Sequence, residues 1–225
     1  LARVAQSFVC KMCRGGGRKA ADEFNFKDVL LECVYEFAYL GDMLNDTGGV
    51  EQAVAARVRA AWMKFRELGG ILCTRGASLR MKGVVYKACV RSVLTYGAET
   101  WAMKAGVFQK LQTTERRMLR MICGVTLRDK VESTVIASRV GVNDLEEHLR
   151  QKRLRWFGHI VRRDEEVEIK KVLELKIGQR KRGRPVKRWI DVVGEDMKKR
   201  GVVQQDAGDR EGWRRRAVKG LANPC

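Results

Sequence analysis

Hydrophobic residues from Val50 onward recur at spacings of three and four, which is the repeat of an amphipathic helix. The first stripe runs from Val50 to Leu72, and Ser78 is placed to cap a second helix. Asn143, followed three residues later by Glu146, has the pattern of a capping box that opens another helix. Further helices are expected at Gly106–Cys123, Glu132–Val140, Asp144–Arg163, Trp189–Arg200 and Arg210–Lys219.

A different pattern precedes these helices. Residues 25–44 are β-rich and partly alternating, which indicates two short strands, and Asn45–Gly49 has the composition of a turn. The predicted fold is therefore mainly α, with a short β-hairpin near the N-terminus followed by a helical bundle and a basic linker with C-terminal helices. The expected domains are a flexible segment at 1–24, the hairpin at 25–48, a helical domain at 49–175, and the linker with its helices at 176–225.

Positive charge is concentrated in the helical part of the chain. The whole sequence has 46 Lys and Arg against 27 Asp and Glu, but residues 1–48 hold 6 basic and 7 acidic side chains. The remaining 40 basic and 20 acidic residues give residues 49–225 a net charge of +20. Such an imbalance favours a polyanionic partner, first RNA, DNA or an RNA–DNA hybrid, and second an anionic membrane surface. No apolar run approaches transmembrane length, so no membrane-spanning segment is expected, and nucleic acid rather than a membrane is the expected partner.

The segment RKRGRP at Arg180–Pro185 is the sharpest local motif. Its Arg-Gly-Arg-Pro core matches the AT-hook, in which extended backbone places two arginines in a narrow A·T minor groove. A solvated basic linker or a nuclear-import signal explains the same residues. The candidate nucleic-acid contacts of this segment and its continuation are Arg180, Lys181, Arg182, Arg184, Lys187 and Arg188.

A second basic segment, RLRWFGHIVRR, occupies Arg153–Arg163. Arginines beside an aromatic ring pair with phosphates and stack on bases. Trp156 lies on the apolar stripe of the expected helix with Leu145, Leu149 and Ile160, so its expected place is in the core. The candidate nucleic-acid contacts of this segment are Arg153, Arg155, Arg162 and Arg163.

Cys10 and Cys13 have the two-residue spacing with which two thiolates reach one zinc ion. No second pair of ligands lies near them, so they are either half of a zinc site or free thiols. Seven cysteines, an odd and scattered set, indicate a reducing, intracellular compartment. No Asp-Asp pair, Walker loop or HExxH motif occurs, so a complete catalytic site is not expected in this chain, nor a cofactor.

Five motifs in a fixed order resemble the C-terminal part of the reverse transcriptase encoded by non-LTR retrotransposons of the RTE-like kind. They are YLG at Tyr39–Gly41, SVLTYGAETW at Ser92–Trp101, RLRWFGHIVRR at Arg153–Arg163, GRPVKRW at Gly183–Trp189 and DREGWRR at Asp209–Arg215. The resemblance covers nearly the whole chain, from about Val9 to Val218.

The resemblance implies that a palm with paired aspartates, which hold magnesium, and the fingers lie upstream of Leu1. It implies a zinc-binding stretch in the intact parent that ends at Cys10 and Cys13, and a thumb between Val50 and about Cys123. Because the catalytic carboxylates are absent, this chain is expected to be inactive alone and to grip template–primer in the nucleus. The thumb contacts expected at the minor groove are Arg57, Arg59, Lys64 and Arg66. The alternative is a free-standing AT-hook-like DNA-binding protein.

Overall fold

The computed structural model describes residues 50–164, 169–170 and 188–220, together with the backbone of five short strands before residue 46. The helical elements follow the expected order closely, so the prediction of a mainly helical chain is confirmed. Their bounds are α1 (Glu51–Glu67), α2 (Gly69–Leu72), α3 (Leu79–Val85), η3 (Tyr86–Arg91), α4 (Ser92–Leu94), η4 (Ala98–Thr100), α5 (Ala105–Cys123), α6 (Ser133–Val140), α7 (Leu145–Val161), α9 (Trp189–Arg200), η5 (Gln204–Gly208), α10 (Arg210–Trp213) and η6 (Arg214–Val218).

The N-terminal part of the predicted fold class is wrong. From residue 50 onward the described residues form helices and no strand, and the expected single hairpin at 25–48 is not what precedes them. The backbone before residue 46 has short strands in two separate sheets, ordered β1-β3-β2 and β4-β5. Alternation of side chains shows that a segment is extended but not which strand it pairs with. The strands are β1 (Ser7–Val9), β2 (Phe24–Phe26), β3 (Val29–Val34), β4 (Glu36–Tyr39) and β5 (Asp42–Asn45).

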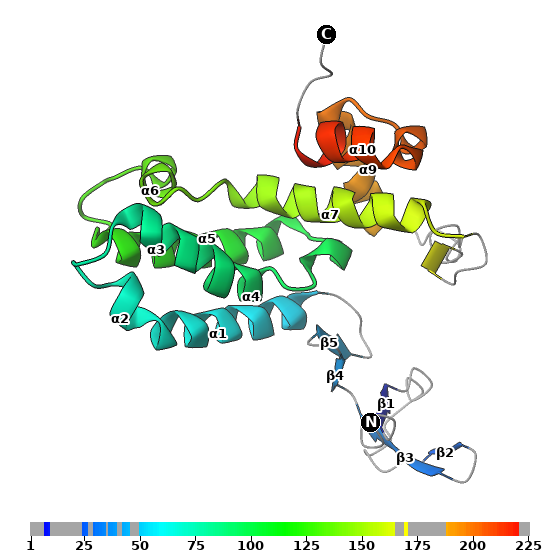
Figure 1. Ribbon diagram of the computed structural model, residues 1–225. Coiled ribbons are helices and arrows are strands. Elements are labelled where there is room, and N and C mark those ends of the chain that lie inside the picture. Colours follow the sequence, from blue (N-terminus) through cyan, green and yellow to red (C-terminus); the bar gives the residue numbers. More distant parts are fainter. Residues whose placement is uncertain are drawn as a thin grey trace.

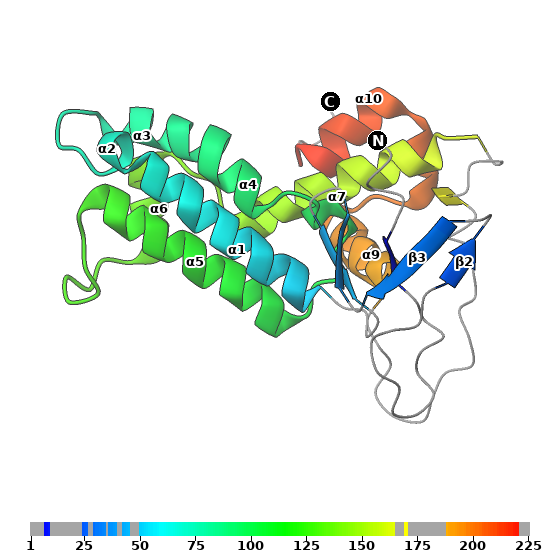
Figure 2. The same cartoon turned by 90° about the horizontal axis from the view of Figure 1, so that it is seen from below.

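The helices from α1 to α6 form one bundle. α1 lies beside α5, with α3, η3 and α4 forming a continuous rod along the other side of α1 (Figures 1 and 2). Phe65 of α1, Tyr86 of η3 and Leu111 and Met118 of α5 are almost fully buried between these helices. The apolar stripes seen in the sequence therefore face one another, and their removal from water stabilises the bundle.

Helices α3 and α7 begin at side-chain caps. Ser78 accepts a hydrogen bond from Met81 N at 3.3 Å, which confirms the predicted start of α3. Asp144 accepts from Glu147 N at 3.1 Å, so Asp144, and not Asn143, caps α7. Asn and Asp are equally good N-caps, and a sequence that contains both in succession does not say which one is used.

A buried polar cluster fastens the middle of the bundle. Arg91 Nε lies 3.0 Å from Glu115 Oε1, and the Tyr86 hydroxyl donates to the same carboxylate at 3.3 Å. Arg91 also donates to Asn143 O at 2.8 Å, which ties η3 to the start of α7. Burial raises the pKa of Glu115 to about 6, although the Arg91 charge opposes this shift.

Helix α7 joins this bundle to a second, smaller core. Its first half contributes Leu145 and Leu149 to the bundle, and its second half contributes Leu154 and Phe157 to a cluster with α9, η5, α10 and η6. These later elements lie along the C-terminal half of α7 (Figure 1). Trp156 is only half-buried and belongs to neither cluster, so the expectation that it lies in the core is wrong.

Candidate nucleic-acid interface

Segments of four of the five sequence motifs meet along the C-terminal half of α7. Trp213 Nε1 donates a hydrogen bond to Leu154 O at 2.8 Å, and Trp189 Nε1 donates to Glu99 O at 2.7 Å. The rings of both tryptophans approach Phe157, with centroids 5.9 Å from it for Trp213 and 6.3 Å for Trp189. Glu99 and Trp213, which are 114 positions apart in the sequence, are thus brought together around Phe157 of α7.

Gly158 allows Trp213 to lie directly against α7. A Cβ atom at Gly158 would lie 2.4 Å from Trp213 Nε1 and 2.6 Å from Trp213 Cδ1, which is closer than nonbonded atoms approach. The glycine between Phe157 and His159 is therefore needed for this contact, and the contact holds α10 and η6 against α7.

Replacing Gly158 by alanine is expected to lower the free energy of unfolding by about 1–3 kcal/mol, because the added methyl group displaces a buried indole. Gly194 provides the matched control, since it lies in the middle of α9 and a Cβ there meets nothing within 4 Å. Gly194→Ala is expected to stabilise the protein by about 0.5–1 kcal/mol through helix propensity. Urea denaturation measures both, and equal effects of the two changes would contradict the packing role of Gly158.

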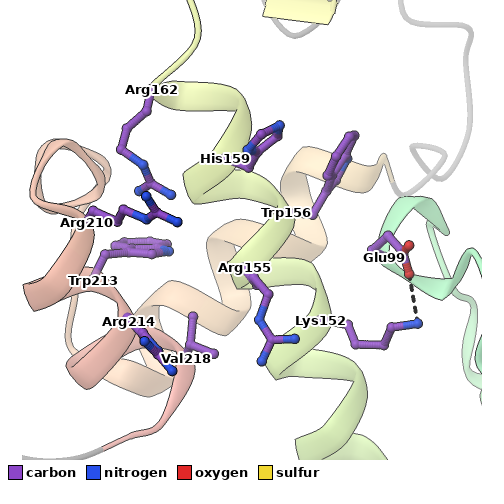
Figure 3. Close-up of a pocket in the computed structure, with 10 residues that line it drawn as sticks. All are labelled: Glu99, Lys152, Arg155, Trp156, His159, Arg162, Arg210, Trp213, Arg214 and Val218. Atoms are coloured by element: carbon purple, nitrogen blue, oxygen red, sulfur yellow. Dashed lines mark ion pairs between the residues drawn. The ribbon is translucent and has the colours of Figure 1, made fainter. Parts of the chain in front are cut away.

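A solvent-open pocket of about 600 Å³ lies between α7 and the elements that pack on its C-terminal half (Figure 3). We call it the arginine pocket. Helix α7 forms one side, α10 and η6 form another, and Glu99 of η4 closes one end. Five of the lining side chains are cationic and one is a carboxylate. The lining residues are Glu99, Lys152, Arg155, Trp156, His159, Arg162, Arg210, Trp213, Arg214 and Val218.

The single carboxylate of the arginine pocket already has a partner. Glu99 Oε2 lies 3.0 Å from Lys152 Nζ, so these two charges offset each other. Arg155, Arg210 and Arg214 are exposed and make neither an ion pair nor a side-chain hydrogen bond within residues 50–164 and 188–220. The pocket therefore holds arginine charge that no carboxylate of the described chain neutralises.

Arg162 also lines the arginine pocket, close to the positive charge of Arg210. Its Nη1 donates to Ala207 O at 2.7 Å, which holds the guanidinium in the lining of the pocket. Partial burial, and then the neighbouring charge of Arg210, lower the pKa of Arg162 below its ordinary value. The guanidinium still carries its charge at neutral pH, so an anion bound between Arg162 and Arg210 would relieve their repulsion.

The four arginines predicted as contacts in the segment 153–163 lie in three different environments. Arg155 and Arg162 line the arginine pocket. Arg163 is exposed and donates to His159 Nε2 at 3.3 Å. Arg153 is 5% exposed, and its Nε lies 2.7 Å from Asp196 Oδ2 in α9. Arg153 is thus part of the contact between two helices, and we leave it out of the proposed interface.

The four basic residues predicted on α1 do not share one face. Residues seven apart lie on the same side of a helix, so Arg57 pairs with Lys64 on one side and Arg59 with Arg66 on the opposite side. Arg57 lies over the Tyr96 ring at 4.6 Å, and Lys64 forms an ion pair with Glu67 at 2.5 Å. One face of α1 therefore does not present all four to a nucleic acid, and their role as contacts stays a prediction.

Part of the predicted site lies outside the residues that the structure describes. Arg180–Arg184, Lys187, Cys10 and Cys13 lie outside the described residues, so the AT-hook-like contact, the zinc site and the domain boundaries stay predictions. Arg188 is exposed and lies 3.3 Å from Asp191. The described residues include no cluster of three or more metal-ligating side chains, and none of their helices is long and apolar enough to span a membrane.

Sequence reasoning missed two groups of basic residues. Arg210 and Arg214 belong to the last of the five motifs but are not among the expected contacts, because nothing in their spacing shows that they face α7. The other group is Arg116, Arg117 and Arg120 of α5, which line a second hollow of about 630 Å³ with no carboxylate among its lining residues. The concentration of charge after residue 48 was the only signal for either group.

The comparisons with known proteins support an origin in a transposable element. The chain is 26% identical over 174 residues to an uncharacterised transposon-derived protein of Caenorhabditis elegans. The aligned region covers 74% of this chain and 62% of that relative, so the chain spans less than two thirds of the relative's length. No protein-family model and no solved structure matches the chain.

Proposed function

We propose that this chain is the nucleic-acid-binding C-terminal part of a reverse transcriptase of a non-LTR, RTE-like retrotransposon, and that it grips template–primer through phosphates. The observation that carries the proposal is the arginine pocket, where Arg155, Arg210 and Arg214 have no counter-charge among the described residues. Phosphates are the natural partners of unpaired guanidinium groups. The ordered motifs and the transposon-derived relative support the assignment to a retrotransposon.

The salt dependence of binding tests this function. With three unpaired arginines contacting phosphates, log K for an RNA–DNA template–primer is expected to fall against log salt with a slope of about −3 or steeper. Fluorescence anisotropy of a labelled template–primer between low and physiological salt gives the slope. Binding that does not weaken as salt rises, or no binding at all, would contradict phosphate-mediated grip.

The reverse-transcriptase assignment has a separate test. Transcripts that contain this coding region are expected to continue upstream of Leu1 in the same frame and to encode the paired aspartates of a polymerase palm. A transcript whose frame starts near Leu1 without such a palm would favour a free-standing DNA-binding protein instead.

A further inference from the structure

Trp156 occupies an unusual place for the residue type. It lies within an amphipathic helix, yet it is only half-buried, contributes to neither hydrophobic core and lines the arginine pocket. Tryptophan has a large apolar surface, and leaving part of it in water is unfavourable unless something covers it. Phe157, the next residue, fills the core position that the helix offers.

The ring of Trp156 belongs to a preformed aromatic platform. His159, one turn later on α7, stacks on it with ring centroids 5.5 Å apart and an angle of 23° between the planes. Arg163 donates to His159 Nε2 and so holds the imidazole in place. Both rings project from the same side of α7 in Figure 3. The lining of the pocket therefore combines a flat aromatic surface with arginine side chains.

We propose that the arginine pocket binds an unpaired nucleotide, with its base stacked on the aromatic platform of Trp156 and His159 and its phosphate held by Arg162 and Arg210. The proposal rests on the proposed function and specifies its ligand. A nucleotide combines a flat aromatic base with an anionic phosphate, and the pocket supplies a partner for each. A volume of about 600 Å³ is in the range of pockets that hold small molecules of nucleotide size.

The distribution of charge in the pocket determines which end takes the base of the nucleotide and which end takes its phosphate. Glu99 lies at the end near Trp156, and Arg210 and Arg214 lie at the opposite end (Figure 3). At the Glu99 end the carboxylate is offset by Lys152, so a phosphate gains less there than beside Arg210 and Arg214, whereas a base edge there meets a hydrogen-bond acceptor. Bases inside a duplex have both faces covered by their neighbours, so only an unpaired nucleotide reaches the platform.

The test compares a single-stranded oligoadenylate, roughly 12 nucleotides long, with a blunt duplex, both as anisotropy probes. Trp156→Leu is expected to weaken single-strand binding roughly 5- to 150-fold and to change duplex binding little, because it removes one base–aromatic stack. Trp156→Phe is expected to restore most of the affinity. Tyr96→Leu is the matched control, since Tyr96 is 52% exposed and lies under Arg57 outside the pocket.

A second experiment uses the wild-type chain, so its result does not depend on whether a variant folds. Replacing the bases of the oligonucleotide with abasic sites is expected to cost as much affinity as Trp156→Leu. Equal binding of the abasic and normal strands, or an equal effect of Trp156→Leu on strand and duplex, would overturn the platform. Those results would not affect salt-dependent binding, so the proposed function would stand. If neither the single strand nor the duplex binds, both the aromatic platform and the proposed function are contradicted.

Discussion

Replacing Asp196 by asparagine is expected to lower the free energy of unfolding by about 3–5 kcal/mol. The side chains of Asp196 and Arg153 are both about 5% exposed, and the Asp196 carboxylate also lies 3.3 Å from Arg150 Nε. Asparagine keeps the shape of aspartate but removes its charge, which leaves the Arg153 guanidinium buried without a counter-charge. The pair joins α7 to α9, so the loss is expected at the contact between these two helices.

Guanidinium chloride denaturation measures this change, and Glu67→Gln is its control. Glu67 forms an ion pair with Lys64 at 2.5 Å, but their side chains are 57% and 41% exposed. Water screens such a pair, so its removal is expected to cost less than about 1 kcal/mol. Losses of similar size for Asp196→Asn and Glu67→Gln would show that the buried pair contributes no more than a surface one.

The positions of the helices were predictable because each depends on its own sequence. The expected helix Gly106–Cys123 corresponds to α5, Ala105–Cys123, and Ser78 caps α3 as its position suggested. An apolar stripe and a capping side chain are local signals, and the end of α5 at Gly124, in the left-handed region, is another. The start of α7 was misplaced by one residue because Asn143 and Asp144 give the same signal.

The arginine pocket was not predictable to the same extent. Its arginines come from α7 and from α10 and η6, which follow about 50 residues later in the sequence. The contact between Gly158 and Trp213 joins these elements, but it produces no periodic pattern of hydrophobic residues from which it could be predicted. Trp156 was misplaced for a related reason. Helix α7 packs against two cores in succession, so its buried face turns after Leu149, and a single stripe drawn along the helix assigns the wrong residue.

Neutralising the arginine pocket is expected to have the largest effect on binding. The variant Arg155→Gln/Arg210→Gln/Arg214→Gln removes three charges that have no partner in the described chain, so its stability is expected to change little. If each arginine contacts a phosphate, affinity for template–primer falls roughly 100-fold or more at ~0.1 M salt. The matched control is Arg75→Gln/Arg80→Gln/Arg128→Gln, which removes the same charge from exposed sites outside the pocket.

The most direct test of the central claim is the salt slope of template–primer binding for these two triple variants. Net charge is equal in both, so a difference between them reports the pocket and not the general positive field. The slope of log K against log salt is expected to become shallower by about two to three units in the pocket variant and to stay unchanged in the control. Equal slopes for the two variants would contradict the assignment of the nucleic-acid interface to the arginine pocket.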